Sequence, residues 1–120
     1  MKGKVFLIHW SAPEAEELAK PLQKDGWQVC VEAEDGARAC RTILGERPDV
    51  IVVSLARLPS HGIGTAYYLR SVRETCHLPI VFVGGDGETV ANAKNKVPDA
   101  MFTDVPKLGK TLSPLSKQKA

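Results

Sequence analysis

The sequence predicts an α/β fold, a doubly wound, flavodoxin-like three-layer sandwich around a five-stranded parallel sheet of strand order 2-1-3-4-5. Short apolar runs of strand length alternate along the chain with segments of helical periodicity. The run at residues 50–53 is unbroken and mostly β-branched, which is typical of a strand covered on both faces. Strands that alternate with helices pair in parallel through right-handed crossovers. A chain of 120 residues forms one such domain.

The first strand is the apolar run at residues 5–8. Ser11 is placed to cap the helix that follows, and Pro13 falls in its first turn. Pro21 lies inside this helix, and we expect it to kink or shorten the helix. The helix carries one apolar stripe at positions i, i+3, i+4 and i+7, formed by Ala15, Leu18, Ala19 and Leu22.

The second strand covers residues 29–31, after Trp27, and a short helix follows it. We expect that helix to end at Gly45, because glycine is a poor helix former. The third strand covers residues 50–53. We expect the third helix to begin only after Gly62 and Gly64.

The fourth strand covers residues 80–83 and is followed by a polar helix at residues 88–96. The fifth strand covers residues 100–103. Leucines at 108, 112 and 115 predict a last, weak helix. We therefore expect one domain at residues 1–115 and a frayed tail at 116–120.

The composition is that of an ordinary globular protein. A net charge of +2 is too small to indicate nucleic-acid binding, and no apolar run approaches the length of a membrane span. Cys30, Cys40 and Cys76 lack metal-ligand spacing, so we predict no metal site and expect buried free thiols. These features favour a cytoplasmic protein that contacts neither nucleic acid nor membrane.

Several segments, in this order, resemble a response-regulator receiver domain of the chemotaxis-regulator type. They are KVFLI, VEAEDGARA, RPDVIVVSL, the glycine at position 62, LPIVFV and PDAMFTDVP. The resemblance extends from Lys4 to about Leu115. It implies a role in signal transduction through a two-component system or phosphorelay.

The resemblance also implies a phosphorylation site, and this sequence departs from it at each position. The acidic pair that holds Mg²⁺ falls on His9 and Trp10, and the phosphoacceptor aspartate falls on Ser54. The hydroxyl residue that follows the fourth strand falls on Gly84, and the lysine that precedes a proline falls on Val105. Mg²⁺ prefers oxygen ligands, and none of these positions supplies a carboxylate. The resemblance therefore implies a pseudo-receiver with no enzymatic activity and no cofactor, although a phosphoacceptor elsewhere in the chain stays open.

The altered strand ends offer a different candidate pocket for a small ligand or an anion. Its residues are Arg57, His61, Gly85, Asp86 and Asp104. In the simpler alternative, Trp10 fills the space and the polar groups satisfy one another. A hydrolase triad is disfavoured because no glycines flank Ser54, and cobalamin-type binding because the first-strand loop lacks the required His and Gly.

Receiver domains commonly signal through the face of their fourth helix, fifth strand and fifth helix. Here that face would present apolar residues surrounded by lysines, namely Lys94, Lys96, Met101, Phe102, Lys107 and Lys110. Such a face suits a signalling protein with acidic residues, or a self-dimer. A merely solvated helix face is the other interpretation.

Overall fold

The computed structural model describes residues 2–116 and confirms the predicted architecture. One sheet of five parallel strands has the order β2-β1-β3-β4-β5. The strands are β1 (Gly3–Ile8), β2 (Trp27–Glu32), β3 (Val50–Ser54), β4 (Ile80–Val83) and β5 (Met101–Thr103). The helices are α1 (Ala12–Lys24), α2 (Gly36–Glu46), α3 (Pro59–Ser71), α4 (Gly87–Lys96) and α5 (Leu108–Leu112). Short 3₁₀ turns, Val105–Lys107 and Ser113–Leu115, flank α5.

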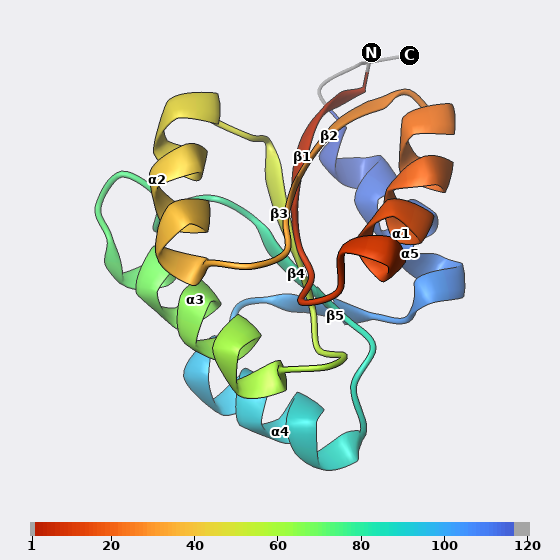
Figure 1. The fold of residues 1–120 in the computed structure, drawn as a ribbon. Coiled ribbons are helices and arrows are strands. Elements are labelled where there is room, and N and C mark those ends of the chain that lie inside the picture. Colours follow the sequence, from red (N-terminus) through yellow and green to blue (C-terminus); the bar gives the residue numbers. More distant parts are fainter. Residues whose placement is uncertain (1, 117–120) are drawn as a thin grey trace.

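The helices cover both faces of the sheet, with α1 and α5 on one face and α2, α3 and α4 on the other (Figure 1). Successive residues of a strand point to opposite faces. In β1, Phe6 and Ile8 therefore pack toward α2 and α3, while Val5 and Leu7 pack toward α1 and α5. Because both faces are covered, the central strands are apolar throughout, as the run at residues 50–53 predicted.

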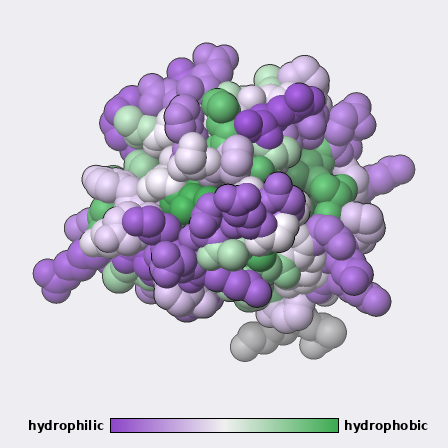
Figure 2. Space-filling model, turned by 90° about the horizontal axis from the view of Figure 1, so that it is seen from below, coloured by the Kyte–Doolittle hydropathy of each residue, from purple (hydrophilic) through white to green (hydrophobic). Residues whose placement is uncertain are grey.

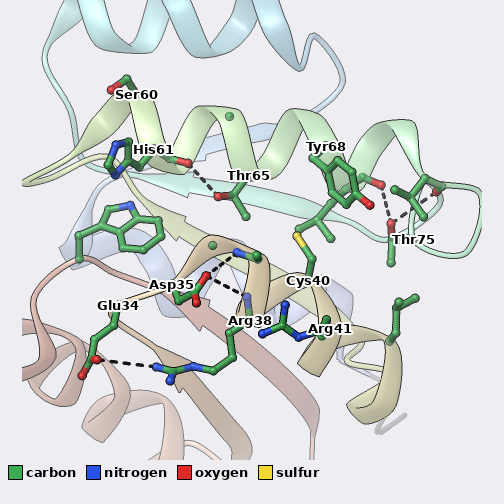
Figure 3. Close-up of a pocket in the computed structure, with 17 residues that line it drawn as sticks. Glu34, Asp35, Arg38, Cys40, Arg41, Ser60, His61, Thr65, Tyr68 and Thr75 are labelled. Atoms are coloured by element: carbon green, nitrogen blue, oxygen red, sulfur yellow. Dashed lines mark hydrogen bonds and ion pairs between the residues drawn. The ribbon is translucent and has the colours of Figure 1, made fainter.

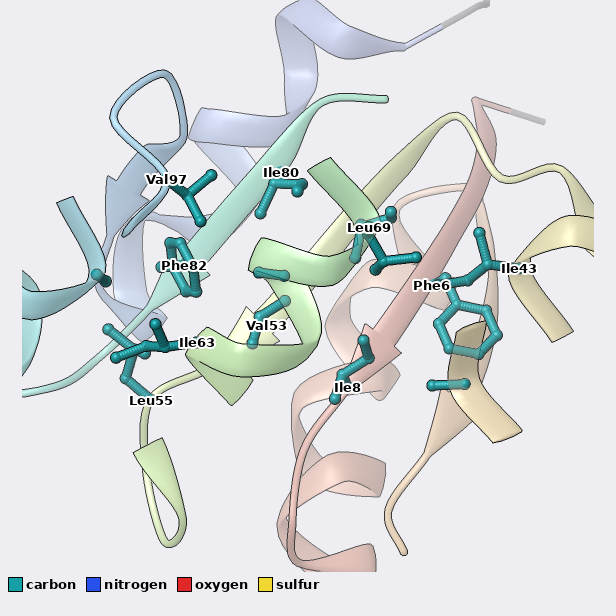
Figure 4. Packing of buried hydrophobic residues seen from close by; sticks show 14 residues of the cluster. Phe6, Ile8, Ile43, Val53, Leu55, Ile63, Leu69, Ile80, Phe82 and Val97 are labelled. Carbon is teal, nitrogen blue, oxygen red and sulfur yellow. The ribbon is translucent and has the colours of Figure 1, made fainter. Parts of the chain in front are cut away.

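The larger core cluster lies between the sheet and the three helices α2, α3 and α4 (Figure 4). Phe82 on β4 and Phe6 on β1 are each at most 1% exposed and form its aromatic part. Ile43 from α2 and Leu69 from α3 pack onto the strands in the same cluster. This layer fixes where α2 and α3 lie relative to each other.

α1 continues through Pro21 to Lys24 and is not shortened, and Ser11 caps it as predicted. Two other expected helix boundaries were wrong. α2 passes Gly45 and ends at Glu46, followed by the C-cap Arg47, whose φ of 50° lies in the left-handed region. α3 begins at Pro59, so that Gly62 lies inside the helix. A proline fits the first helical turn because it needs no N–H partner there.

The cysteines are less buried than expected. Cys30 and Cys40 are half-buried, and Cys76 is exposed in the turn that follows α3. The expectation of three buried thiols was therefore wrong. Within residues 2–116, no helix is long and apolar enough to cross a membrane.

The predicted tail at 116–120 lies almost entirely outside the described residues. Ser116 is described, and its hydroxyl donates a hydrogen bond to the Lys2 carbonyl at 2.9 Å. This bond holds the last described residue against the beginning of β1.

Candidate functional site

The carboxyl ends of the five strands meet at one edge of the sheet, where ligands bind in folds of this type. The His9 N–H donates to the Glu32 carbonyl at 3.1 Å, and the Gly84 N–H donates to the Thr103 carbonyl at 3.0 Å. Together with Ser54, which ends β3, these residues stand on neighbouring strand ends. Figure 2 shows the molecule from the end toward which β1 runs in Figure 1, with small hydrophobic areas separated by hydrophilic side chains.

Ser54 and His9 are buried at this edge. Ser54 is 3% exposed, and its hydroxyl accepts the Ala56 N–H at 3.1 Å. His9 is 5% exposed, and its Nδ1 accepts the Ser11 N–H at 3.3 Å. Burial lowers the pKa of His9, which favours the neutral imidazole. Both side chains line a groove of about 870 Å³ between α1 and α5.

Trp10 lies on the opposite side of the strand end from His9. Its ring lines a second groove, between α2 and α3, and meets the His61 ring edge-on with centroids 5.9 Å apart. The indole Nε1 is buried and has no hydrogen-bond partner within residues 2–116. A Cβ on Gly62 would lie 3.5 Å from that nitrogen, so the indole packs directly on the first turns of α3.

Arg57 is engaged by a carboxylate. Its Nε donates to Oε2 of Glu14 on α1 at 2.5 Å, and this guanidinium lowers the pKa of Glu14. The backbone of Arg57 has a φ of 70°, in the left-handed region, which residues other than glycine adopt only at a cost in conformational energy. The pair joins the loop after β3 to the start of α1.

The other candidate pocket residues lie apart from one another. His61 lines the α2–α3 groove, whereas Gly85 faces Leu55. Asp86 caps α4 by accepting the Thr89 N–H at 2.8 Å, and Asp104 is exposed in the loop after β5. The five predicted residues therefore do not line one common pocket.

The strand ends do not fit a Mg²⁺ ion. Such an ion is usually held by one or two carboxylates together with water and substrate oxygens. His9, Trp10 and Ser54 supply none, and no three His, Cys, Asp or Glu side chains in the described part of the chain form a group that could hold a metal.

An ion pair at the end of β2 was not predicted from the sequence. Glu32 is 6% exposed, and both of its carboxylate oxygens accept hydrogen bonds from Arg38 on α2. An acidic residue at the end of a strand, six positions before an arginine in the next helix, was the available signal.

Some residues of the candidate partner face contact one another, whereas Lys96 contacts α3. The Lys94 Nζ lies 5.4 Å from the centroid of the Phe102 ring, and Phe102 stacks on Phe82 with centroids 5.3 Å apart. Lys96 instead lies over the ring of Tyr67 on α3. Met101 is half-buried. Lys107, in the 3₁₀ turn before α5, and Lys110 on α5 are both exposed.

Solved structures of receiver domains share this fold. Chemotaxis protein CheY4 of Vibrio cholerae aligns with a TM-score of 0.78 and 20% identity, covering 96% of this chain and 99% of that one. The signal receiver domain of a signal transduction histidine kinase from Syntrophus aciditrophicus aligns with a TM-score of 0.77 and 20% identity, covering 94% and 89%.

One curated relative is similar in sequence. It is the phosphate regulon transcriptional regulatory protein PhoB of Pseudomonas aeruginosa, 33% identical over 89 residues. The match covers 73% of this chain and spans 38% of the length of PhoB. No family model matches the sequence. The chain thus has the fold of response-regulator receiver domains.

Proposed function

We propose that the chain is a pseudo-receiver, a non-enzymatic signalling module that acts by protein–protein contact and without aspartyl phosphorylation. The single observation that carries this proposal is the state of Ser54. It is a buried hydroxyl bonded to the Ala56 N–H, at the position where the receiver resemblance requires an ionised aspartate. A neutral serine lacks the carboxylate nucleophile of that reaction.

The positions around Ser54 support the same proposal. His9 is a buried imidazole with a lowered pKa, and Trp10 turns its ring into the α2–α3 groove. Val105, at the position of the lysine, is 59% exposed and carries no charge to pair with a phosphoryl group. Since His9, Trp10 and Ser54 supply no carboxylate and Val105 supplies no cation, the surfaces of the fold are the remaining means of signalling in the described part of the chain.

For the partner, we propose the face of α4, β5 and α5, with Lys94, Phe102, Lys107 and Lys110 as its contacts. The stacked Phe102 ring is half-buried beneath the Lys94 ammonium, which gives apolar area with positive charge around it. A signalling protein with an acidic surface fits this arrangement, and a second copy of the chain is the other candidate. The proposed setting is the cytoplasm, in signalling of the two-component type.

The alternative, a small-ligand or anion sensor at the strand ends, is less well supported. It needs Arg57 free to hold an anion, and Arg57 is paired with Glu14. The two functions predict opposite mutational results. A captured protein partner should be lost with Lys94→Ala or Phe102→Ala and retained with Arg57→Ala or His61→Ala.

The decisive experiment is mass spectrometry after incubation with acetyl phosphate and Mg²⁺, alongside thermal melting with and without Mg²⁺. We expect no mass gain and no Mg²⁺-dependent rise in the melting temperature. A gain of one phosphate would contradict the proposal, and peptide mapping would then identify the acceptor. Chemotaxis protein CheY4 serves as the comparison protein of the same fold.

A further inference from the structure

The groove between α1 and α5 has a volume of about 870 Å³ and lies at the carboxyl ends of the central strands. The two helices cover the same face of the sheet (Figure 1). Leu7 on β1 and Val52 on β3 point toward this face. Side chains alternate along a strand, so His9 and Ser54, two residues further on, point the same way and line the groove. Cavities of this size hold small molecules in many proteins.

His9 and Ser54 lie side by side on adjacent strand ends. Ile8 pairs with Val53 in the parallel register, and His9 and Ser54 are the next residues of the two segments. Adjacent strands are about 4.8 Å apart. His9 is 5% exposed and Ser54 is 3% exposed, and polar groups buried to this degree normally have a hydrogen-bond partner. A free donor on either side chain is therefore a point at which a ligand can bind.

Each of the two side chains has one free donor. The Nδ1 of His9 accepts the Ser11 N–H at 3.3 Å, which places the ring proton on Nε2. This Nε2–H meets no acceptor within residues 2–116. The Ser54 Oγ accepts the Ala56 N–H at 3.1 Å, and its own proton meets no acceptor in that part of the chain. A carbonyl oxygen has two lone pairs and can therefore accept from both side chains at once.

The space around these donors is open and mostly apolar. A Cβ on Gly84, which follows the neighbouring strand β4, would meet no atom within 4 Å. Leu18 on α1 and Leu108 on α5 line the groove and are buried. Val105 is 59% exposed and Pro106 is exposed, and both line the groove as well. A ligand that covers these two residues is stabilised by the removal of apolar surface from water.

The charges of the groove disfavour an ionic ligand at the two donors. The lining includes four charged side chains, Glu14, Glu17, Lys24 and Asp25. The three carboxylates are bound to Arg57, Lys20 and Lys2, respectively. Lys24 lies ten residues beyond Glu14 on α1, about 15 Å along the helix. Burial lowers the pKa of His9 and favours its neutral form, so an anion finds no unpaired cation there among the residues described, while an ammonium group has no lone pair for the donors.

The groove between α2 and α3 offers no such pair of donors among the residues described. The Thr65 hydroxyl donates to the His61 carbonyl at 2.8 Å (Figure 3). The buried Thr75 hydroxyl donates to the Leu69 carbonyl at 2.6 Å. The indole Nε1 of Trp10 has no partner but is buried against α3. Of the two grooves, the one between α1 and α5 therefore presents a pair of free, buried donors.

We propose that the α1–α5 groove binds a small, neutral, largely apolar molecule whose carbonyl oxygen accepts hydrogen bonds from His9 Nε2 and Ser54 Oγ. This site differs from the anion pocket considered above, because it uses none of the five residues of that pocket and needs no free cation. It is additional to the proposed contact of the α4–β5–α5 face and does not depend on it.

The test compares four probes that share a phenylethyl group and differ in their polar group. Benzylacetone carries a ketone, hydrocinnamamide an amide, hydrocinnamate a carboxylate and phenylpropylamine an ammonium group. Each probe is titrated into the natural chain, and the shifts of backbone amide and imidazole N–H groups are followed by NMR. We expect the ketone and the amide to bind with dissociation constants on the order of 1 mM, and at least about fivefold more tightly than the two ions. Their shifts should map to His9, Ser54 and Gly84.

Ser54→Ala removes one donor and should weaken the binding of benzylacetone about fivefold. Thr65→Ala removes a hydroxyl from the α2–α3 groove and is the matched control, so its affinity should stay within about twofold of that of the natural chain. The comparison of the four probes uses the natural chain and therefore tests the proposal even where Ser54→Ala is unstable.

Four results would overturn the proposal. They are no saturable shift with the ketone or the amide, shifts confined to α2 and α3, hydrocinnamate that binds at least as tightly as benzylacetone, and undiminished binding to a folded Ser54→Ala. The same shifts on concentrating the protein without a probe would show that a second copy covers the groove, and would overturn it as well.

Discussion

The guanidinium of Arg38 binds both carboxylate oxygens of Glu32, with Nε–Oε1 and Nη2–Oε2 distances of 2.7 Å. Oε2 also accepts the backbone N–H groups of Glu34 and Asp35, at 3.0 Å and 3.1 Å. One side chain thus fixes the turn between β2 and α2. The hydrogen bond from Arg38 is the main reason that the pKa of Glu32 is lowered to about 2.

Glu32→Gln should destabilise the protein by about 1–2 kcal/mol at neutral pH, since charge-assisted hydrogen bonds are lost but the half-exposed Arg38 stays solvated. Because the pKa of Glu32 is lower in the folded state, its ionised carboxylate stabilises the folded protein at pH values above 4.5, the pKa in the unfolded chain. This stabilisation is lost as the pH falls from 4.5 toward 2. The free energy of unfolding of the natural chain should therefore fall over this range, and less steeply in Glu32→Gln. Urea denaturation between pH 2 and pH 7 measures both slopes.

Glu34→Gln is the control for this prediction, because the Glu34 side chain is 80% exposed and its carboxylate lies 3.9 Å from Arg38. Its stability should stay within about 0.5 kcal/mol of the natural chain. Equal losses in the two variants would show that Glu32 has no special role.

Gly62 and Gly64 should respond in opposite directions to alanine. A Cβ on Gly62 would lie 2.9 Å from Val53 Cγ1 and 3.2 Å from the Ser54 carbonyl oxygen, whereas one on Gly64 would meet nothing within 4 Å. Gly64→Ala should stabilise by about 0.5–1 kcal/mol through helix propensity. Gly62→Ala should destabilise by about 1–3 kcal/mol through overpacking. Thermal and urea unfolding of the two variants measure both changes in the free energy of unfolding. Stabilisation by Gly62→Ala would contradict the close contact of Gly62 with Val53 and Ser54.

His9 should make the protein less stable at mildly acidic pH. Burial is the largest cause of its lowered pKa, so protonation favours the unfolded state, whose histidine titrates near 6.5. The neutral His9 stabilises the folded protein fully above pH 6.5, and this contribution is lost as the pH falls below 6.5. His9→Asn keeps an acceptor for the Ser11 N–H and should flatten the dependence of stability on pH between 7 and 5. An NMR titration that places the pKa of His9 above 6.5 would refute this account.

Restoring the carboxylates should restore metal binding. In the triple variant His9→Asp, Trp10→Asp and Ser54→Asp, acidic groups stand on adjacent strand ends, as Mg²⁺ requires. With a dissociation constant on the order of 1 mM, 10 mM Mg²⁺ would stabilise this variant by roughly 1.4 kcal/mol. Melting curves with and without Mg²⁺ measure the effect within the same variant. Ser54→Asp alone is the control and should show no Mg²⁺ dependence. A metal effect in the natural chain would argue against the proposed function.

The strands could be predicted from the sequence because their apolar runs are local. The gathering of His9, Ser54 and Gly84 at one edge follows from parallel pairing alone. Helix ends were harder to predict. A glycine at position 62 favours a helix start after it, whereas Gly62 lies in α3 where the helix passes close to Val53 and the Ser54 carbonyl. That approach is a tertiary contact with no local signature.

The side-chain directions at the site could not be predicted either. Arg57 was one candidate to hold an anion, and the sequence does not reveal that Glu14, forty-three positions away, is its partner. Trp10 and His9 are adjacent in the chain but line different grooves. These contacts depend on the face of the sheet toward which each loop side chain points. The positions of the residues in the sequence do not determine that face.

The bond between Ser116 and the Lys2 carbonyl has a practical consequence for engineering. It brings the two ends of the described chain together at the start of β1, and the six residues of that strand separate them from the edge with His9 by about 20 Å. A fluorescent protein could be fused at either end, or the domain could be inserted into a loop of a host protein. In both cases the attachment would lie at the edge where β1 begins, opposite the edge with His9. Biosensors built in this way should leave the edge of the sheet with His9 and Ser54 open.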